Sequence, residues 1–215
     1  MVNIIVVNEI FRSIQGESTY AGLPTTFIRT TGCNLRCRWC DTKYAYEDGT
    51  AMTVDDIADK VKRLGSGLVE ITGGEPLLQE GVGGLMRHLL DNGFIVMIET
   101  NGSLDIGKID KRAIIVMDVK CPGSGMSERM RWENLDVLDR KDQVKFVIAD
   151  RADYVWTLDL LGRYKRLLDQ TVLFSPVFGL MPLDDLASWI LEDNINVRLH
   201  LQMHKYIWEP NRRGV

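Results

Sequence analysis

Three cysteines, Cys33, Cys37 and Cys40, lie close together in the segment CNLRCRWC of this 215-residue chain, and a fourth, Cys121, lies far from them. Such a group could be ordinary buried thiols, a redox pair, a zinc site or an iron–sulfur cluster. A structural zinc ion needs four protein ligands, and no second Cys or His pair completes such a set. A redox pair would leave Cys33 unexplained. Three thiolates on a four-iron cluster leave one iron free for a small molecule, so the cluster is the favoured interpretation.

The composition is that of a globular protein. Hydrophobic residues make up 45% of the chain, charged residues 26%, and the formal net charge is −4, which argues against binding to nucleic acids or acidic membranes. No apolar run approaches the ~18 residues of a membrane span, and the N-terminus lacks the basic leader of a signal peptide. We therefore expect a cytoplasmic protein, with reduced thiols, that forms a single domain over residues 1–215.

Alternating apolar runs and amphipathic segments predict an α/β fold. After an N-terminal strand, seven mostly apolar runs are predicted as parallel strands: 25–31, 68–72, 94–100, 113–120, 143–148, 171–176 and 196–202. Helices are predicted at 53–65, where Thr53 and Asp56 form a capping pattern, and at about 80–92, 127–140, 151–168 and 182–194. Six or seven strands are too few for a closed eight-stranded barrel. A partial parallel β/α barrel is favoured over an open doubly wound sheet.

The residues best suited to chemistry follow the ends of predicted strands. TGGEP begins at Thr72, ETNG at Glu99 and DVKCP at Asp118. The carboxyl ends of parallel strands meet at one edge of the sheet, where ligands bind in such folds. We therefore expect these segments and the cysteines to share one site. Taken alone, Gln15 and Glu17 in SIQGES predict only a solvated hairpin turn.

The spacing CxxxCxxC, with Trp39 before its last cysteine, resembles the radical S-adenosylmethionine superfamily. The preceding TFIRTTG and the following TGGEP agree with that resemblance in order and distance. It implies a 4Fe–4S cluster on Cys33, Cys37 and Cys40 whose free iron binds S-adenosylmethionine. It also implies that one electron cleaves a carbon–sulfur bond of this cofactor and gives a 5′-deoxyadenosyl radical, so that the cofactor supplies the chemistry and no side chain is assigned as catalytic.

Further motifs resemble the 7-carboxy-7-deazaguanine synthase family. They are EIFRSIQGES at 9–18, Arg29, CDT at 40–42, and a tail that contains HK at 204–205, Trp208 and RGV at 213–215. One departure is Ser18, where the family has glycine. The implied reaction converts 6-carboxy-5,6,7,8-tetrahydropterin to 7-carboxy-7-deazaguanine by hydrogen abstraction at C6, ring contraction and loss of ammonia, for 7-deazapurine (queuosine-type) biosynthesis.

The resemblance also implies residue roles. The implied cofactor-binding residues are Trp39, Cys40, Asp41, Gly73, Gly74, Glu75, Glu99, Asp118, Val119 and Lys120. The implied substrate-binding residues are Ile14, Gln15, Gly16, Glu17, Arg29, Thr72 and Val215. Thr42 is implied as a ligand of Mg²⁺, which suits a hard ion that keeps its waters. Residues 1–24 form a substrate-side extension, and the tail at 203–215, with His204 and Lys205, closes the site.

The resemblance further implies an external electron donor of the flavodoxin or ferredoxin type and a homodimer. Two alternatives remain open at this point. A radical activase acting on a partner protein would share CxxxCxxC and GGEP but not the SIQGE segment or the RGV tail. A non-enzymatic zinc-binding module would share only the cysteines. His88, His200, His204 and Cys121 are expected to have no metal-binding role.

Overall fold

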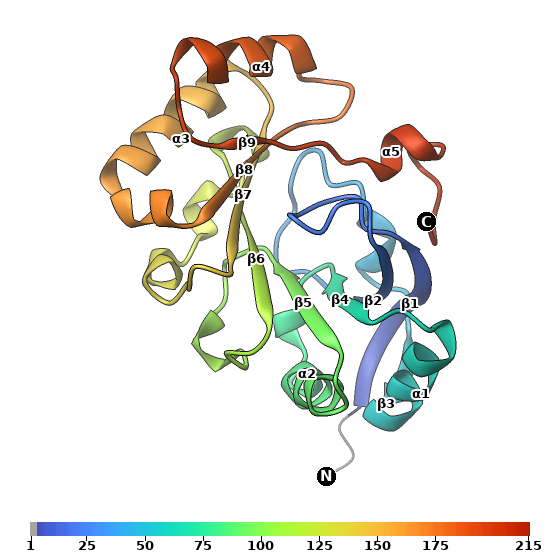
Figure 1. The fold of residues 1–215 in the computed structure, drawn as a ribbon. Helices are drawn as coiled ribbons and strands as arrows, with labels where there is room; N and C mark the ends of the chain where they lie inside the picture. The colour runs from blue at the N-terminus through green and yellow to red at the C-terminus, as the bar shows by residue number, and fades with distance from the viewer. Residues whose placement is uncertain (1–3) are drawn as a thin grey trace.

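The computed structural model describes residues 4–215, which fold around one nine-stranded sheet (Figure 1). The first three residues of the predicted 1–24 extension lie outside this range. The strands lie in the order β3-β1-β2-β4-β5-β6-β7-β8-β9. Their bounds are β1 (Ile4–Ile14), β2 (Pro24–Thr30), β3 (Thr50–Thr53), β4 (Leu68–Gly73), β5 (Ile95–Thr100), β6 (Ile114–Val119), β7 (Gln143–Ile148), β8 (Thr171–Pro176) and β9 (Arg198–Leu199).

The pairs from β2-β4 through β8-β9 in this order are all parallel. Strand β1 pairs antiparallel with both β2 and β3. The two edge strands, β3 and β9, do not pair with each other, so the sheet is not closed. The prediction of a partial parallel barrel is therefore confirmed. The sequence did not predict β3, which pairs with the first half of β1 and leads into the cap of the next helix.

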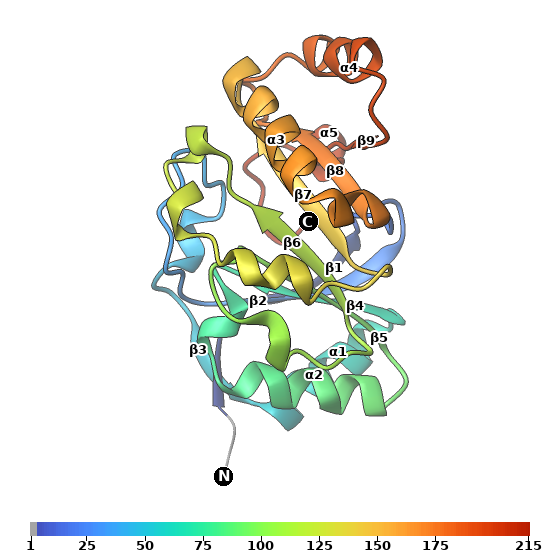
Figure 2. The same ribbon diagram turned by 90° about the vertical axis from the view of Figure 1, so that its left-hand side faces the viewer.

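Four helices cover one face of the sheet, as Figures 1 and 2 show: α1 (Val54–Leu64), α2 (Gly81–Asp91), α3 (Arg151–Arg163) and α4 (Leu183–Glu192). The short α5 (His204–Ile207) lies apart from them, in the C-terminal tail (Figure 1). The main core forms between α1–α4 and this face. On the other face, Leu68, Met97, Ile114 and Val116 form a smaller apolar cluster under Tyr20. The rest of that inner face is therefore available for polar groups.

The predicted cap of α1 is confirmed. Thr53 Oγ1 accepts a hydrogen bond from Asp56 N at 3.1 Å, the Asp56 carboxylate takes up the Thr53 backbone N–H in return, and Gly65 ends the helix with a φ of 73°. This cap fixes where β3 ends and α1 begins.

Three predicted boundaries were wrong. Residues 127–140, predicted as one helix, form two short 3-10 helices at Ser127–Arg129 and Trp132–Asp136. The reason is the buried Asn134 side chain, which donates to Gly102 O at 2.9 Å and Leu104 O at 2.7 Å. These bonds connect the segment to the loop after β5. Helix α3 stops at Arg163 rather than 168. Tyr164, which stacks on Trp132, separates it from a 3-10 helix at Lys165–Asp169. Strand β9 covers only 198–199, because His200 turns inward to bond with Ser175.

Candidate active site

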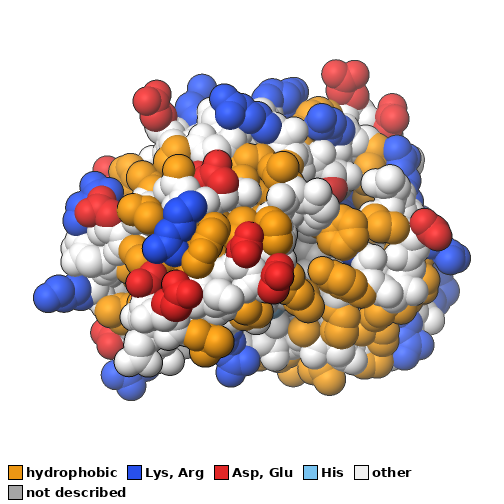
Figure 3. Space-filling view, turned by 90° about the horizontal axis from the view of Figure 1, so that it is seen from above, with side chains coloured by type: hydrophobic (Ala, Val, Ile, Leu, Met, Phe, Trp, Pro, Cys, Tyr) orange, Lys and Arg blue, Asp and Glu red, His pale blue; other side chains and the backbone are white. Residues whose placement is uncertain are grey.

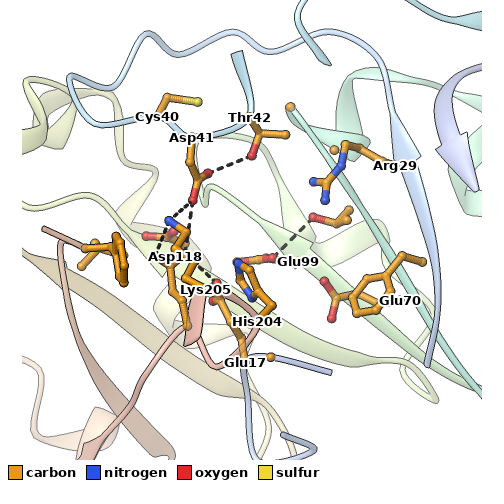
Figure 4. A pocket seen from close by; sticks show the side chains of 18 of the residues that line it. Glu17, Arg29, Cys40, Asp41, Thr42, Glu70, Glu99, Asp118, His204 and Lys205 are labelled. Carbon is orange, nitrogen blue, oxygen red and sulfur yellow. Dashed lines mark hydrogen bonds and ion pairs between the residues drawn. The ribbon is translucent and has the colours of Figure 1, made fainter. Parts of the chain in front are cut away.

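A cavity of about 480 Å³ opens at the carboxyl ends of the parallel strands (Figure 4). Three parts of the chain that are distant in sequence line it: the segment after β1, the loop after β2, and the C-terminal tail. The tail returns from β9 to the N-terminal strands, as its red ribbon shows in Figure 1. Nearly all residues that the sequence marked as site residues line this one cavity. They are Ile14, Gln15, Gly16, Glu17, Arg29, Cys33, Cys37, Trp39, Cys40, Asp41, Thr42, Thr72, Gly73, Gly74, Glu99, Asp118, Lys120 and Val215.

The three-thiol loop, residues 33–40, forms one end of the cavity. Cys33, Cys37 and Cys40 are all half-buried, and burial raises the pKa of Cys33 and Cys37. Among residues 4–215, no three Cys, His, Asp or Glu side chains converge closely enough to hold one metal ion. A cluster with several irons binds its thiolates at separate metal atoms, so it does not require three side chains to converge on one point.

Neighbouring backbone holds this loop in place. A Cβ on Gly74 would lie 2.3 Å from Gly32 O and 2.7 Å from Cys33 Cβ, so the end of β4 needs glycine to approach the loop. On the other side, a Cβ on Gly123 would lie 3.0 Å from the Trp39 ring. Only glycine at these two positions lets the loop sit between the strand ends.

Two residues of the predicted cofactor set, Glu75 and Val119, lie outside the cavity lining. Glu75 is fully buried; its carboxylate accepts from Asn101 N at 2.7 Å, Thr100 Oγ1 at 2.9 Å and Leu77 N at 3.0 Å. These bonds fix the loop after β5, which places the Asn101 amide nitrogen 3.9 Å from Cys33 Sγ. In this structure Glu75 shapes the site from behind, and a direct contact with a cofactor stays a prediction for both residues.

The opposite end of the cavity contains an ionic layer made of Glu17, Glu99, Asp118 and Lys145. The Lys145 ammonium lies 2.5 Å from Glu17 Oε2 and 3.5 Å from Asp118 Oδ2, and it also pairs with Glu99. The Lys145 side chain is only 5% exposed. The three carboxylates come from the segment after β1 and from the ends of β5 and β6, so one ammonium joins three separate elements. Their negative charge holds the pKa of Lys145 well above its usual value, although burial opposes this.

Gln15 and Glu17 belong to this buried end, so the solvated turn that they suggest when taken alone is not what the structure shows. Their implied role in substrate binding stays a prediction. Gln15 is 2% exposed, donates from Nε2 to Glu70 Oε2 at 2.5 Å, and accepts at Oε1 from Glu17 N at 3.1 Å. Burial raises the pKa of Glu17, but the nearby Lys145 outweighs this and lowers it far below the usual value. Glu17 is therefore ionised at neutral pH. Ser18, the departure from the family pattern, accommodates a φ of 65° in this turn.

Arg29 lies between the two ends of the cavity. Its Nε donates to Glu9 Oε1 at 2.8 Å, and Glu9 also accepts from Tyr44 OH at 2.9 Å. This leaves the rest of the guanidinium directed at the cavity, as Figure 4 shows. A guanidinium held in this way can bind a carboxylate through two parallel hydrogen bonds.

The tail closes the cavity by contacts with both ends. Met203 N donates to Gly16 O at 2.9 Å, and a Cβ on Gly16 would lie 2.3 Å from His204 Nδ1. Lys205 Nζ lies 2.5 Å from Asp41 Oδ2, and Asp41 Oδ1 accepts from Thr42 Oγ1 at 2.9 Å. The predicted placement of His204 and Lys205 at the site is thus what the structure shows. His200 and His204 lie in different parts of this region, because His200 follows β9 and His204 begins α5.

Sequence reasoning missed several cavity residues, chiefly Glu70, Lys145, Tyr44 and Gln202. For two of them a signal was present: Glu70 interrupts the apolar run LVEIT and Lys145 the run QVKFVI. A charge at the centre of a buried parallel strand needs a partner, because burying an isolated charge is costly. Cys121 lies outside the cavity lining. It is buried, and its thiol is hydrogen-bonded to the Thr157 hydroxyl.

Comparison with known proteins identifies the class. The family model described as Radical SAM superfamily matches residues 27–187. The chain therefore belongs to the radical SAM superfamily and is an enzyme of that class. A 7-carboxy-7-deazaguanine synthase of Koribacter versatilis is 45% identical over 97% of this chain and 99% of its own length, and one of Chlorobaculum tepidum is 43% identical over 97% and 96%. Within the superfamily, the chain belongs to the 7-carboxy-7-deazaguanine synthase family.

Solved structures support the same fold. The crystal structure of QueE from Escherichia coli matches with a TM-score of 0.76 at 22% identity, over 94% of this chain and 95% of that one. A structure of TYW1 with a lysine–pyruvate adduct matches with a TM-score of 0.62 at 16% identity, over 80% of this chain and 74% of that one. At these identities the likeness concerns the fold alone.

Membership of the superfamily assigns a 4Fe–4S cluster and S-adenosylmethionine to the site. The residues present fit both groups. Three half-buried thiols face a single cavity, which is what a cluster with one open iron requires. Next to them, Gly73 and Gly74 leave backbone accessible along the cavity wall, where a bound cofactor can approach closely.

Across residues 4–215, none of the helices combines the length and the apolar character needed to span a membrane.

Proposed function

We propose that this enzyme converts 6-carboxy-5,6,7,8-tetrahydropterin to 7-carboxy-7-deazaguanine. The observation that carries the proposal is the cavity itself, in which a three-thiol loop and a buried ionic layer face each other under a closing tail. The relatives described above are named 7-carboxy-7-deazaguanine synthase, which supports 7-carboxy-7-deazaguanine as the product. The polar lining of the cavity supports a small heterocycle rather than a protein segment as the substrate. The bound cluster and S-adenosylmethionine would supply one-electron chemistry, namely a carbon radical able to take the hydrogen atom from C6.

The chain's own residues bind and orient the substrate in this proposal. Arg29 pairs with the carboxylate at C6 and so places that carbon toward the three-thiol loop. Ionised Glu17, fixed by Lys145, accepts hydrogen bonds from ring N–H groups. Further contacts come from Ile14, Gln15, Gly16, Thr72 and Val215. On the cofactor side, the contacts come from Trp39, Cys40, Asp41, Gly73, Gly74, Glu99, Asp118 and Lys120, with Glu75 and Val119 behind them.

Mg²⁺ is proposed at Thr42, and the donor set fits it. Thr42 lines the cavity and donates its hydroxyl proton to Asp41, which leaves oxygen lone pairs free for a cation. A hard ion with few protein ligands and several waters suits such a position. Asp41 is itself held by Lys205, so the tail takes part in orienting this hydroxyl.

We further propose one domain over the whole chain, a cytoplasmic location, a homodimer and an electron donor of the flavodoxin or ferredoxin type. On the face drawn in Figure 3, basic and acidic side chains are interspersed with apolar ones.

The test is an anaerobic assay of the reconstituted enzyme with 6-carboxytetrahydropterin, S-adenosylmethionine, reductant and Mg²⁺, followed by mass spectrometry. We expect 7-carboxy-7-deazaguanine from the wild type and little from Arg29→Met. Arg163→Met is the matched control, because Arg163 is exposed and forms an ion pair with Asp159 across one helical turn. Formation of 5′-deoxyadenosine without any deazapurine would leave the superfamily chemistry in place and refute the substrate.

A further inference from the structure

Glu70 is a buried carboxyl group in the cavity that none of the roles above uses. It lies on β4, is 6% exposed, and lines the cavity next to the ionic layer. No lysine or arginine within residues 4–215 forms an ion pair with Glu70. The nearest ammonium, on Lys145, is already shared by Glu17, Glu99 and Asp118. A buried carboxyl group without its own cation is costly, so it needs another partner.

The hydrogen bonds around Glu70 define which of its atoms is free. Gln15 Oε1 accepts from Glu17 N, which turns the Gln15 amide so that Nε2 donates to Glu70 Oε2. Glu70 Oε2 is therefore already an acceptor. No hydrogen bond from the described residues reaches Oε1, and Figure 4 shows the Glu70 carboxyl group at the end of the cavity away from Cys40. The free oxygen thus faces the place where a ligand would lie.

The strand register relates Glu70 to Arg29. Arg29 pairs with Thr72 and Phe27 with Glu70, so Glu70 lies two residues deeper on the neighbouring strand. Two residues along a strand span about 6.6 Å and neighbouring strands are about 4.8 Å apart. A pterin bound by its C6 carboxylate at Arg29 would therefore direct the opposite end of its fused ring toward Glu70. That end carries N3–H and the 2-amino group, which are two parallel hydrogen-bond donors.

We propose that Glu70 is a specificity-determining residue that binds the N3–H and 2-amino edge of the substrate's heterocycle. The inference rests on the proposed pterin substrate and adds a residue that discriminates a 2-amino ring from a 2-oxo ring. A carboxylate accepts two parallel N–H groups, whereas a 2-oxo ring presents one donor beside an acceptor that repels it.

The electrostatics of the cavity agree with this role. Burial and the neighbouring Glu99 raise the pKa of Glu70 to about 8, so Glu70 holds a proton at neutral pH. The other charged groups that face it are Glu17 from the segment after β1, Lys145 from β7 and Arg29 from β2. With Oε2 accepting from Gln15, that proton lies on Oε1. Binding of two N–H donors favours the ionised form, so ligand binding releases the proton.

The test measures binding to the reconstituted holoenzyme, without reductant, by calorimetry with two stable probes, pterin-6-carboxylate and lumazine-6-carboxylate, which differ by the amino or oxygen group at C2. The wild type should prefer the pterin by roughly 10- to 100-fold, the ratio expected for one unmatched buried hydrogen-bonding group. In Glu70→Gln the ratio should fall to one or below, because an amide offers one acceptor and one donor and so complements the 2-oxo ring. In Glu70→Asp the preference should remain, with weaker binding.

The exposed Glu133→Gln is the matched control and should keep the wild-type ratio. Titrations in two buffers with different ionisation enthalpies should show proton release with the wild type and none with Glu70→Gln. If Glu70→Gln keeps its melting temperature, its iron content and the wild-type ratio, the assignment of Glu70 is wrong while the pterin substrate stands. If neither probe binds the wild type, the proposed substrate is wrong and the assignment falls with it.

Discussion

The two ends of the cavity differ in how their polar groups are satisfied. In the three-thiol loop, Cys33 Sγ receives weak contacts from neutral groups, with Leu35 N at 3.4 Å and the Asn101 side-chain amide at 3.9 Å. In the ionic layer, Glu17, Glu99 and Asp118 all form ion pairs with the Lys145 ammonium. The sulfur atoms at one end can therefore act as ligands of a metal cluster, and the other end is preorganised by the protein's own charges.

The largest expected effect comes from removing a thiol. Cys37→Ala should abolish cluster binding, because the remaining two thiolates cannot hold a four-iron cluster that already has one open iron. Iron and sulfide analysis of the reconstituted variant should find almost none, and 5′-deoxyadenosine should not form. Cys121→Ala, which removes the thiol outside the cavity, should keep full iron content. Equal iron in both variants would contradict the difference drawn between the two ends.

Removal of the ammonium tests the other end. Lys145→Met removes the ammonium that pairs with Glu17 and Glu99, while Asp118 keeps its ion pair with Lys120 at 2.8 Å. Loss of one partner from a buried charge group costs about 3–5 kcal/mol of unfolding free energy. Chemical denaturation of the metal-free protein measures this directly. The double variant Lys145→Met/Glu99→Gln should recover part of the loss, because it removes one of the repelling charges. If Lys145→Met denatures like the wild type, the ionic layer does not preorganise this end.

A pH series tests the raised pKa of Glu70, which lies beside the ionic layer. Because the pKa of Glu70 rises from its usual 4.5 to about 8 on folding, the native protein binds more protons than the unfolded chain between these values. The contribution of Glu70 to the free energy of unfolding should therefore fall as the pH rises from about 5 to 8 and then level off. Glu70→Gln should show a shallower fall and a higher melting temperature at pH 8 than the wild type. Parallel curves for the two proteins would refute a raised pKa at Glu70.

The smallest effect is expected where the tail bridges the two ends. Partial desolvation by the surrounding protein raises the pKa of Asp41, but the Lys205 ammonium lowers it overall. Since the Asp41 side chain is 43% exposed, the pair should contribute under about 1 kcal/mol, so Lys205→Met should hardly change stability. We expect a higher Mg²⁺ requirement instead, measured as the Mg²⁺ concentration for half-maximal rate. If this Mg²⁺ concentration is unchanged, the tail does not influence the binding of Mg²⁺ at Thr42.

The two ends also differ in how far the sequence predicts them. The three cysteines, Trp39 and the glycines after β4 occur in short contiguous motifs whose spacing carries the chemistry, so the cluster end could be predicted. The parallel strands were predictable too, because their apolar runs are continuous. The ionic layer was only half predicted. Its carboxylates follow recognisable motifs, but Lys145 joins them only after the strands have been placed side by side.

The failures in the fold have the same origin. The segment 127–140 has a helical composition, yet the buried Asn134 side chain ties it to carbonyl oxygens some 30 residues away in sequence. The turn at Gln15 and Glu17 is polar, yet partners on β4, β7 and the tail bury it. In both cases a tertiary contact outweighs a local preference, and no local pattern could indicate which distant residue would supply that contact.

The contact between Gly16 and the tail has a consequence for biosynthesis. Gln202 bonds to Glu17 across 185 residues of sequence, and Met203 bonds to Gly16. During translation the three-thiol loop leaves the ribosome well before these tail residues. The thiols consequently remain uncovered on the nascent chain while the rest of the sheet is made, and the cavity closes only once the tail has been made.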